Sequence, residues 1–162
     1  VIRDLVLGIT PPMTFRNPIY ATIAILTSIA VFIYAVKAPK KASRKTTDKI
    51  MLIMDAIGLG IFTVMGINTA YMQEQEYSWF LLIFVGVITG VGGGILRDIM
   101  AGDRPYVFVK HFYASASIIG AIVYVIILPY LGTVTSMFVG TGVIIVLRIL
   151  AAKYRWSLPK PE

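Results

Sequence analysis

The sequence has 162 residues, of which 57% are hydrophobic and only 14% are charged, and its mean hydropathy is +0.81. A soluble domain carries about a quarter charged residues, so this composition excludes an ordinary soluble protein and indicates an integral membrane protein. The formal net charge is +7, but the basic residues lie between apolar runs, which favours cytoplasmic loops over a surface for nucleic acid.

Five apolar runs are long enough to cross a membrane. A helix needs roughly 20 residues to span about 30 Å of hydrocarbon, and the runs cover 18–36, 50–71, 79–101, 112–128 and 133–152. We therefore predict an all-α polytopic membrane protein with five complete helices. Residues 1–8 resemble the end of an earlier span, so we expect further chain before Val1.

The charges between these runs predict the orientation. The segment from Lys37 to Lys49 holds six basic residues and one acid, whereas Gln73 to Glu76 holds no basic residue. Basic loops remain on the cytoplasmic side, so residues 37–49 and the C-terminal tail should be cytoplasmic in a plasma-membrane protein. The same basic segment has the composition that attracts anionic lipid headgroups.

A sequence motif occurs twice. Arg3-Asp4 aligns with Arg97-Asp98, and the alignment pairs Gly8 with Gly102 and Pro11 with Pro105. Because three spans separate the copies, they should lie on opposite membrane faces, as in inverted-topology repeats. We predict the remainder of a first repeat at 1–36, a linker at 37–49, a second three-helix repeat at 50–128, and a final helix with its tail at 129–162.

Glycines are concentrated near the second copy of the motif. Gly86, Gly90 and Gly94 are spaced to share one helix face, which favours close helix packing in lipid. For Gly92, Gly93 and Gly94 we favour a functional kink, because consecutive glycines cost about 1 kcal/mol each in a helix and permit an unwound segment. Its carbonyls, with the Thr89 hydroxyl one turn away, are suitable ligands for a cation.

The charged residues within or beside the spans have two interpretations each. Arg97 and Asp98 are either interfacial charges or the lining of a pore mouth, in which Asp98 holds Arg97 by a charge-assisted hydrogen bond; Arg3 and Asp4 would repeat this arrangement outside. Asp55 should face protein or water, either in a structural ion pair with Lys49 or an arginine of the opposite repeat, or as part of the pore. We expect Arg148 to extend towards the lipid headgroups.

Three segments together resemble the TRIC family of trimeric intracellular cation channels, in its bacterial and archaeal branch, also described as glycine-transporter-like. They are Thr89 to Asp98, Met54 to Ala70, and the motif that runs from Arg3 to Pro11 and again from Arg97 to Pro105. The resemblance implies seven helices in the full protein, arranged as two inverted three-helix repeats and one extra helix. It also implies a homotrimer with a pore in each subunit between two glycine-kinked helices.

A monovalent-cation channel of potassium type is thus the function that we expect, with permeant cations as its ligands. The alternative is a secondary transporter for glycine or another small zwitterion, because inverted repeats and broken helices are also typical of transporters. The sequence contains one histidine and no cysteine, so we predict no enzyme, catalytic residue, cofactor or metal site.

Overall fold

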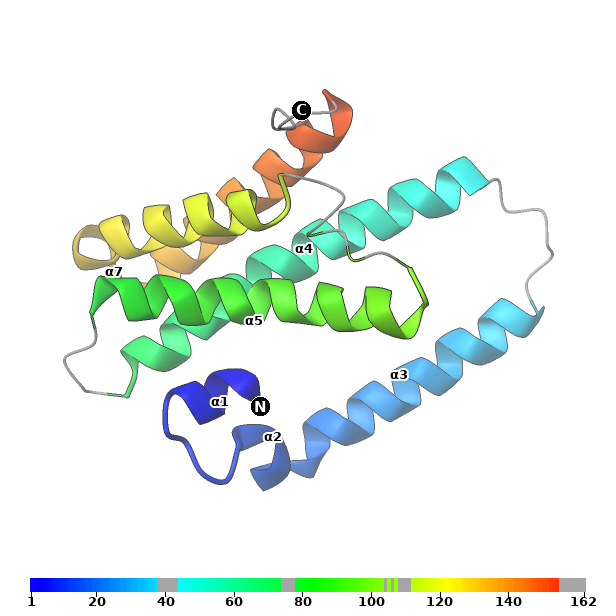
Figure 1. Cartoon of the computed structure of the whole chain (residues 1–162), viewed down its shortest axis with the longest axis horizontal. Coiled ribbons are helices and arrows are strands. Elements are labelled where there is room, and N and C mark those ends of the chain that lie inside the picture. Colours follow the sequence, from blue (N-terminus) through cyan, green and yellow to red (C-terminus); the bar gives the residue numbers. More distant parts are fainter. Residues whose placement is uncertain (38–43, 74–77, 104, 106, 108–111, 155–162) are drawn as a thin grey trace, which may run out of the picture. The chain divides into compact units, whose positions relative to one another are not determined.

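The computed structural model describes residues 1–37, 44–73, 78–103, 105, 107 and 112–154. The chain divides into two compact units, Val1–Lys49 and Ile50–Glu162, which are considered separately. All regular elements of the described residues are helices (Figure 1).

The first unit contains two short helices and one long helix. These are α1 (Ile2–Val6), α2 (Met13–Arg16) and α3 (Pro18–Lys37). Proline at the first position suits the start of α3 because its missing N–H needs no partner there. Asn17 also caps this end, since its Oδ1 accepts a hydrogen bond from the Ile19 N–H at 3.1 Å.

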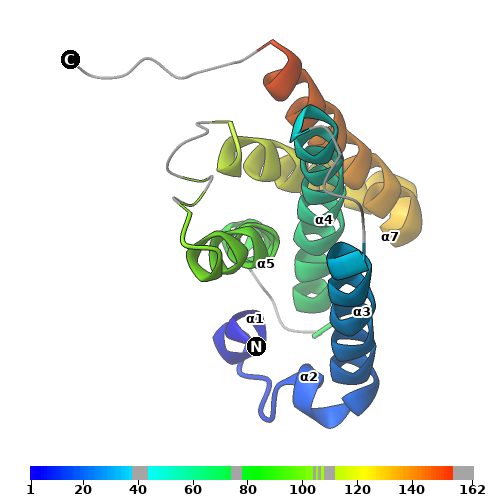
Figure 2. The same ribbon diagram turned by 90° about the vertical axis from the view of Figure 1, so that its right-hand side faces the viewer.

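The second unit holds the longer helices α4, α5 and α7. Helix α4 (Arg44–Tyr71) enters it from the first unit, and α5 (Trp79–Met100) begins after Ser78, whose hydroxyl accepts from the Phe80 N–H. Helix α7 (Ala114–Lys153) is interrupted at Gly132, where φ is 71° and ψ is 170°. Figures 1 and 2 show its two arms, residues 114–131 in yellow and 133–153 in orange and red, beside α4 and α5.

The predicted spans are confirmed as helices, with two differences in their limits. The spans expected at 112–128 and 133–152 form the two arms of α7, because the left-handed backbone that glycine tolerates at Gly132 turns the chain without a longer loop. Helix α4 begins at Arg44 rather than Ile50, and its apolar part begins at Lys49. Within the described residues, α4, α5 and α7 are long and apolar enough to cross a membrane, and α3 contains a shorter apolar stretch, Ala21–Tyr34.

Two glycines on one face of α5 let α4 approach closely. A Cβ at Gly86 would collide with the Ile67 side chain of α4, and a Cβ at Gly90 would collide with the Thr63 hydroxyl. The same Thr63 hydroxyl lies 2.7 Å from the Ser117 hydroxyl of α7, so three helices meet at this point. The packing role predicted for Gly86 and Gly90 agrees with these contacts.

The glycine run itself remains helical. Gly92 and Gly93 have open space around them and Gly94 faces Tyr113, yet all three keep the helical conformation inside α5. The predicted unwound segment is therefore wrong for this structure. Within a membrane an intact helix satisfies its own backbone N–H and C=O groups, which accounts for the difference.

Both copies of the Arg-Asp motif end in the same local structure. Each helix end closes with glycine at positive φ, 71° at Gly8 and 74° at Gly102. Three backbone hydrogen bonds recur at equivalent positions: Leu7 to Arg3, Gly8 to Leu5 and Ile9 to Asp4 in the first copy, and Ala101 to Arg97, Gly102 to Ile99 and Asp103 to Asp98 in the second. This is the Schellman arrangement of a helix C-terminus, and its recurrence supports the predicted duplication.

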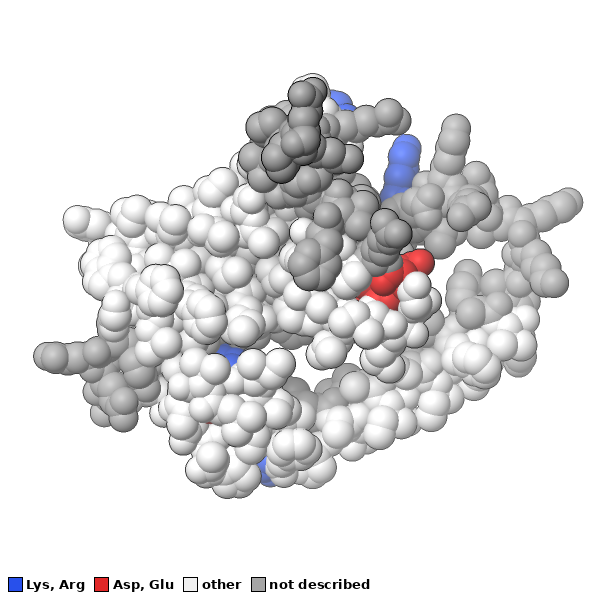
Figure 3. Space-filling model, viewed as in Figure 1, with Lys and Arg blue, Asp and Glu red and all other residues white. Residues whose placement is uncertain are grey.

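The surface of the described residues is largely uncharged in the view of Figure 3. Exposed apolar side chains are numerous on the helices, among them Phe32, Phe80 and Phe138 at 70% exposure or more. Such a surface suits contact with lipid. Residues 38–43 of the basic segment and the tail at 155–162 lie outside the residues that the structure describes, so the roles predicted for the segment and the tail stay predictions.

Candidate functional site

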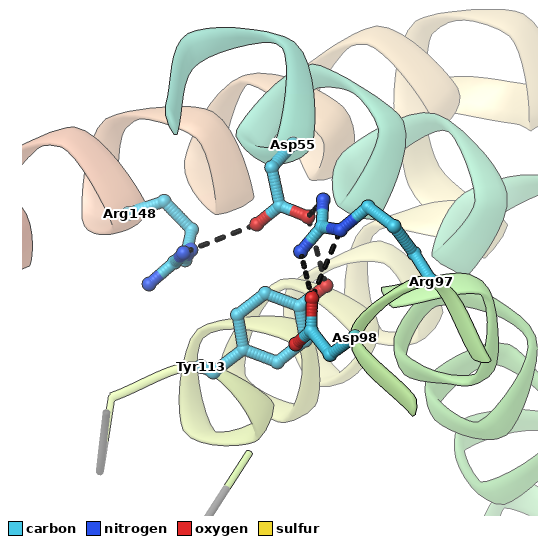
Figure 4. A network of polar contacts seen from close by, with 5 residues as sticks. All are labelled: Asp55, Arg97, Asp98, Tyr113 and Arg148. Atoms are coloured by element: carbon cyan, nitrogen blue, oxygen red, sulfur yellow. Dashed lines mark hydrogen bonds and ion pairs between the residues drawn. The ribbon is translucent and has the colours of Figure 1, made fainter. Parts of the chain in front are cut away.

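Four charged side chains and a tyrosine form one polar cluster in the second unit. Asp55 comes from α4, Arg97 and Asp98 from the end of α5, Tyr113 from the residue before α7, and Arg148 from its second arm (Figure 4). We call these five residues the Asp55 cluster. It joins all three long helices of the unit at one level.

Asp55 is the centre of the cluster because it accepts hydrogen bonds from three donors. Its Oδ1 lies 2.8 Å from Arg97 Nη1 and 3.2 Å from the Tyr113 hydroxyl, and its Oδ2 lies 3.2 Å from Arg148 Nη2. The Asp55 side chain is only 5% exposed. A buried carboxylate is costly unless it is paired and hydrogen-bonded, and these contacts meet that requirement. The predicted partners, Lys49 or an arginine of the opposite repeat, are wrong, because Arg97 belongs to the same predicted repeat as Asp55 and Arg148 belongs to the final helix.

Arg97 connects two carboxylates. Its Nε and Nη2 both donate to Asp98 Oδ1, at 2.9 and 2.8 Å, while Nη1 donates to Asp55. Asp98 is buried and Arg97 is 37% exposed. The predicted hydrogen bond from Arg97 to Asp98 is thus present, and it has the geometry of a charge-assisted pair.

Arg148 lies inside the protein rather than at the lipid headgroups. It is 2% exposed, it pairs with Asp55, and its guanidinium carbon lies 4.6 Å from the centre of the Tyr113 ring. The expectation that it extends to the headgroups is therefore wrong. The physical reason is its position one turn after Ile144, on the buried face of the second arm.

Tyr113 is fixed by Gly94 as well as by the charges. Its hydroxyl occupies the space that a Cβ at Gly94 would need. The phenolic hydroxyl of Tyr113 donates its hydrogen bond to the Asp55 carboxylate.

A groove between α4 and α5 leads to the cluster. Its volume is about 430 Å³, and Asp55 and Arg97 form its polar end. The remaining lining is apolar or glycine: Met51, Met54, Gly58, Leu59, Phe62, Gly90, Gly93 and Gly94. We call this space the α4–α5 groove.

Only some of the pore residues predicted in the second repeat line the groove. Gly90, Gly93, Gly94, Arg97 and Asp55 line it, whereas Thr89, Gly92 and Asp98 do not. Thr89 instead donates to the Val85 carbonyl at 2.6 Å and faces Gly66 of α4. The cation-liganding role predicted for its hydroxyl has no support in this geometry.

The first copy of the motif repeats the inner part of this arrangement. Arg3 Nε donates to Asp4 Oδ1 at 2.7 Å, and Asp4 Oδ2 accepts from the Met13 N–H of α2 at 3.1 Å. Asp4 is fully buried. In both copies, then, the aspartate holds the arginine beside it.

Comparison with known proteins gives the family. The protein-family model described as "Glycine transporter" matches residues 1–36 and 52–129. The UPF0126 inner membrane protein YadS of Escherichia coli is 34% identical over 99% of this chain and 74% of its own length. A UPF0126 membrane protein of Vibrio cholerae is 35% identical over 99% of this chain and 64% of its own.

Solved structures agree with these matches. A TRIC cation channel structure related to conductance has a TM-score of 0.81 and 33% identity, over 99% of this chain and 76% of that chain. A TRIC orthologue from Rhodobacter sphaeroides has a TM-score of 0.83 and 27% identity, over 96% and 76%. The chain belongs to the TRIC family.

The predicted resemblance to the TRIC family is thus confirmed, and so is the all-helical fold class. What sequence reasoning missed in this TRIC chain is the part played by Tyr113 and Arg148. One signal was available, because Gly140, Ile144 and Arg148 follow at helical spacing and share one face. For Arg148, the helix face on which it lies predicts its burial better than its distance from the end of the span does.

Proposed function

We propose that this chain conducts monovalent cations, potassium among them, along the α4–α5 groove. The observation that supports it best is the groove itself, which ends at a paired arginine and carboxylate inside a unit of membrane-spanning helices. The similarity to TRIC cation channels points to the same activity. Ionisable residues inside a membrane protein commonly mark the path of an ion.

The pairing of Arg97 removes the objection to a basic residue in a cation path. Arg97 and Arg148 carry two positive charges, and Asp55 and Asp98 carry two negative charges, so the Asp55 cluster is formally neutral. Arg97 is half-exposed at the groove and acts as a gate in this proposal. It opens the path by leaving Asp55 while it remains bound to Asp98.

The remaining features follow the family resemblance. The protein assembles as a homotrimer in the plasma membrane, with one path in each subunit; the trimer follows the description of the Rhodobacter sphaeroides orthologue as a trimeric channel, and the membrane follows the inner-membrane relative. Residues 37–49 and the C-terminus are cytoplasmic, and Arg3 and Asp4 lie at the outer mouth. The match to channel structures favours a non-enzymatic role.

Recordings of single channels test the proposal. Full-length protein, purified and placed in planar bilayers, should give ohmic unitary currents in KCl that persist with the anion replaced by gluconate. The description of the family model names glycine transport, so uptake of labelled glycine into proteoliposomes is the matched assay. Saturable glycine uptake that depends on an ion gradient, without unitary currents, would reject the channel.

A further inference from the structure

The two arginines bound to Asp55 differ in exposure and in their carboxylate partners. Arg97 lines the α4–α5 groove, is 37% exposed and has Asp98 as a second carboxylate partner. Arg148 is 2% exposed and does not line the groove. Arg97 can therefore leave Asp55 and stay paired, whereas Arg148 has no exposed surface through which to leave.

The two arginines bind different oxygens of the Asp55 carboxylate. Oδ1 accepts from Arg97, the more exposed partner, and from the Tyr113 hydroxyl, whereas Oδ2 accepts from Arg148, the buried partner. In Figure 4 the two guanidinium groups approach the carboxylate from different sides. The Tyr113 hydroxyl contributes a further donor, and the Tyr113 ring lies under the Arg148 guanidinium.

The charges support a second state of the cluster. Asp55 with Arg148 is a neutral pair, and Arg97 with Asp98 is another. When Arg97 turns away from Asp55 and stays bound to Asp98, Asp55 keeps the positive charge of Arg148 and the hydroxyl donor of Tyr113. The cost of burying the Asp55 carboxylate therefore stays compensated. Its Oδ1 then faces the groove without the bond to Arg97.

We propose that Arg148, bound to Oδ2, and Tyr113, bound to Oδ1, are positioning residues that hold the Asp55 carboxylate in place, so that its Oδ1 binds a monovalent cation in the groove whenever Arg97 turns away. This inference rests on the proposed conduction and adds a binding site and two residues to it. A carboxylate oxygen is a hard ligand that suits alkali cations. The site exchanges one cation, the Arg97 guanidinium, for another.

The dependence of unitary conductance on KCl concentration tests the inference. Tyr113→Phe removes the hydroxyl but keeps the ring under Arg148, and Arg148→Met removes the charge at similar length. In both variants we expect the half-saturating K⁺ concentration to change about tenfold, the effect of losing one hydrogen bond to a charged group. Arg148→Lys should restore most of the native value, and Lys153→Met, at an exposed position of the same helix, should match the native protein.

A purely structural role would not produce this result. Unitary conductance is measured on one molecule at a time, so a smaller folded fraction lowers the number of channels and not the concentration dependence. Unchanged concentration dependence in Tyr113→Phe and Arg148→Met, with native currents present, would overturn the inference and leave the proposed function intact.

Thermal unfolding in detergent provides a second test that does not need currents. A cation that binds only the folded protein raises its Tm, so the native protein should be more stable in KCl than in choline chloride at equal concentration. Tyr113→Phe and Asp55→Asn should lose that difference. The absence of any difference in the native protein would contradict the cation site, whereas absent currents with the difference present would contradict only conduction.

Discussion

The hydroxyl of Tyr113 occupies the space that a side chain at Gly94 would need, and from there it donates to Asp55. A glycine of α5 thus borders the Asp55 cluster and leaves room for its tyrosine. Gly93, the residue before it, has no neighbouring atom within 4 Å of an added Cβ. Substitutions at these two positions therefore distinguish a packing role, expected at Gly94, from a role in helix flexibility, which Gly93 could have.

Gly94→Ala should destabilise the protein by about 1–3 kcal/mol, because an added methyl group in a filled space forces neighbours to move. Gly93→Ala should be neutral or stabilising by up to about 1 kcal/mol, since alanine is the better helix former. Thermal unfolding of both variants in the same detergent measures the difference. Equal stability of the two variants would show that the position of the Tyr113 hydroxyl does not depend on the missing side chain at Gly94.

Gly86→Ala tests the contact between α5 and α4. Its new methyl group would collide with Ile67 and lie 2.9 Å from the backbone carbonyl of Thr63, so we expect a loss of about 1–3 kcal/mol. Gly92→Ala is the matched control because its surroundings are open. Denaturation in mixed detergent micelles gives both values, and a stable Gly86→Ala variant would argue against close packing at this point.

Asp4→Asn tests the first copy of the motif. Asp4 is fully buried, pairs with Arg3 and accepts from the Met13 N–H. Removing one member of a buried pair costs about 3–5 kcal/mol, so the Tm of this variant should fall strongly. Asp103→Asn, at an exposed position after the second copy, should change stability by less than about 0.5 kcal/mol; a similar loss in both variants would contradict a special role for Asp4.

Much of the fold was predictable because it depends on local patterns. Apolar runs of about 20 residues marked the helices, and the alignment paired Gly8 with Gly102, which lie at two helix ends with the same backbone hydrogen bonds. The Schellman end needs only a few consecutive residues, so a repeated sequence reproduces a repeated structure.

The Asp55 cluster could not be predicted in the same way. Its hydrogen bonds join Asp55 to residues 42, 58 and 93 positions later in the chain. Which of several arginines pairs with a buried aspartate depends on how helices pack, and sequence periodicity does not contain that information.

Arg97→Ala tests the gate. Asp55 keeps Arg148 and Tyr113, while the groove loses a positive charge, so the local concentration of cations should rise. We expect the unitary K⁺ conductance or the open probability to increase about twofold or more. Single-channel recording measures both quantities, and size-exclusion chromatography shows whether the assembly is intact; an intact variant with native currents would reject the gate.

The central claim is that cations pass along the α4–α5 groove, and cysteine modification tests it most directly. The 162 residues contain no cysteine, so within them Gly93→Cys or Gly58→Cys introduces a single thiol at a groove position where a Cβ meets no atom within 4 Å. Leu96→Cys, exposed on α5 and absent from the groove lining, is the control. A positively charged methanethiosulfonate reagent should reduce the unitary K⁺ current of both groove variants and leave the current of the control unchanged. Native currents from the two groove variants, after mass spectrometry has shown complete modification, would contradict the account.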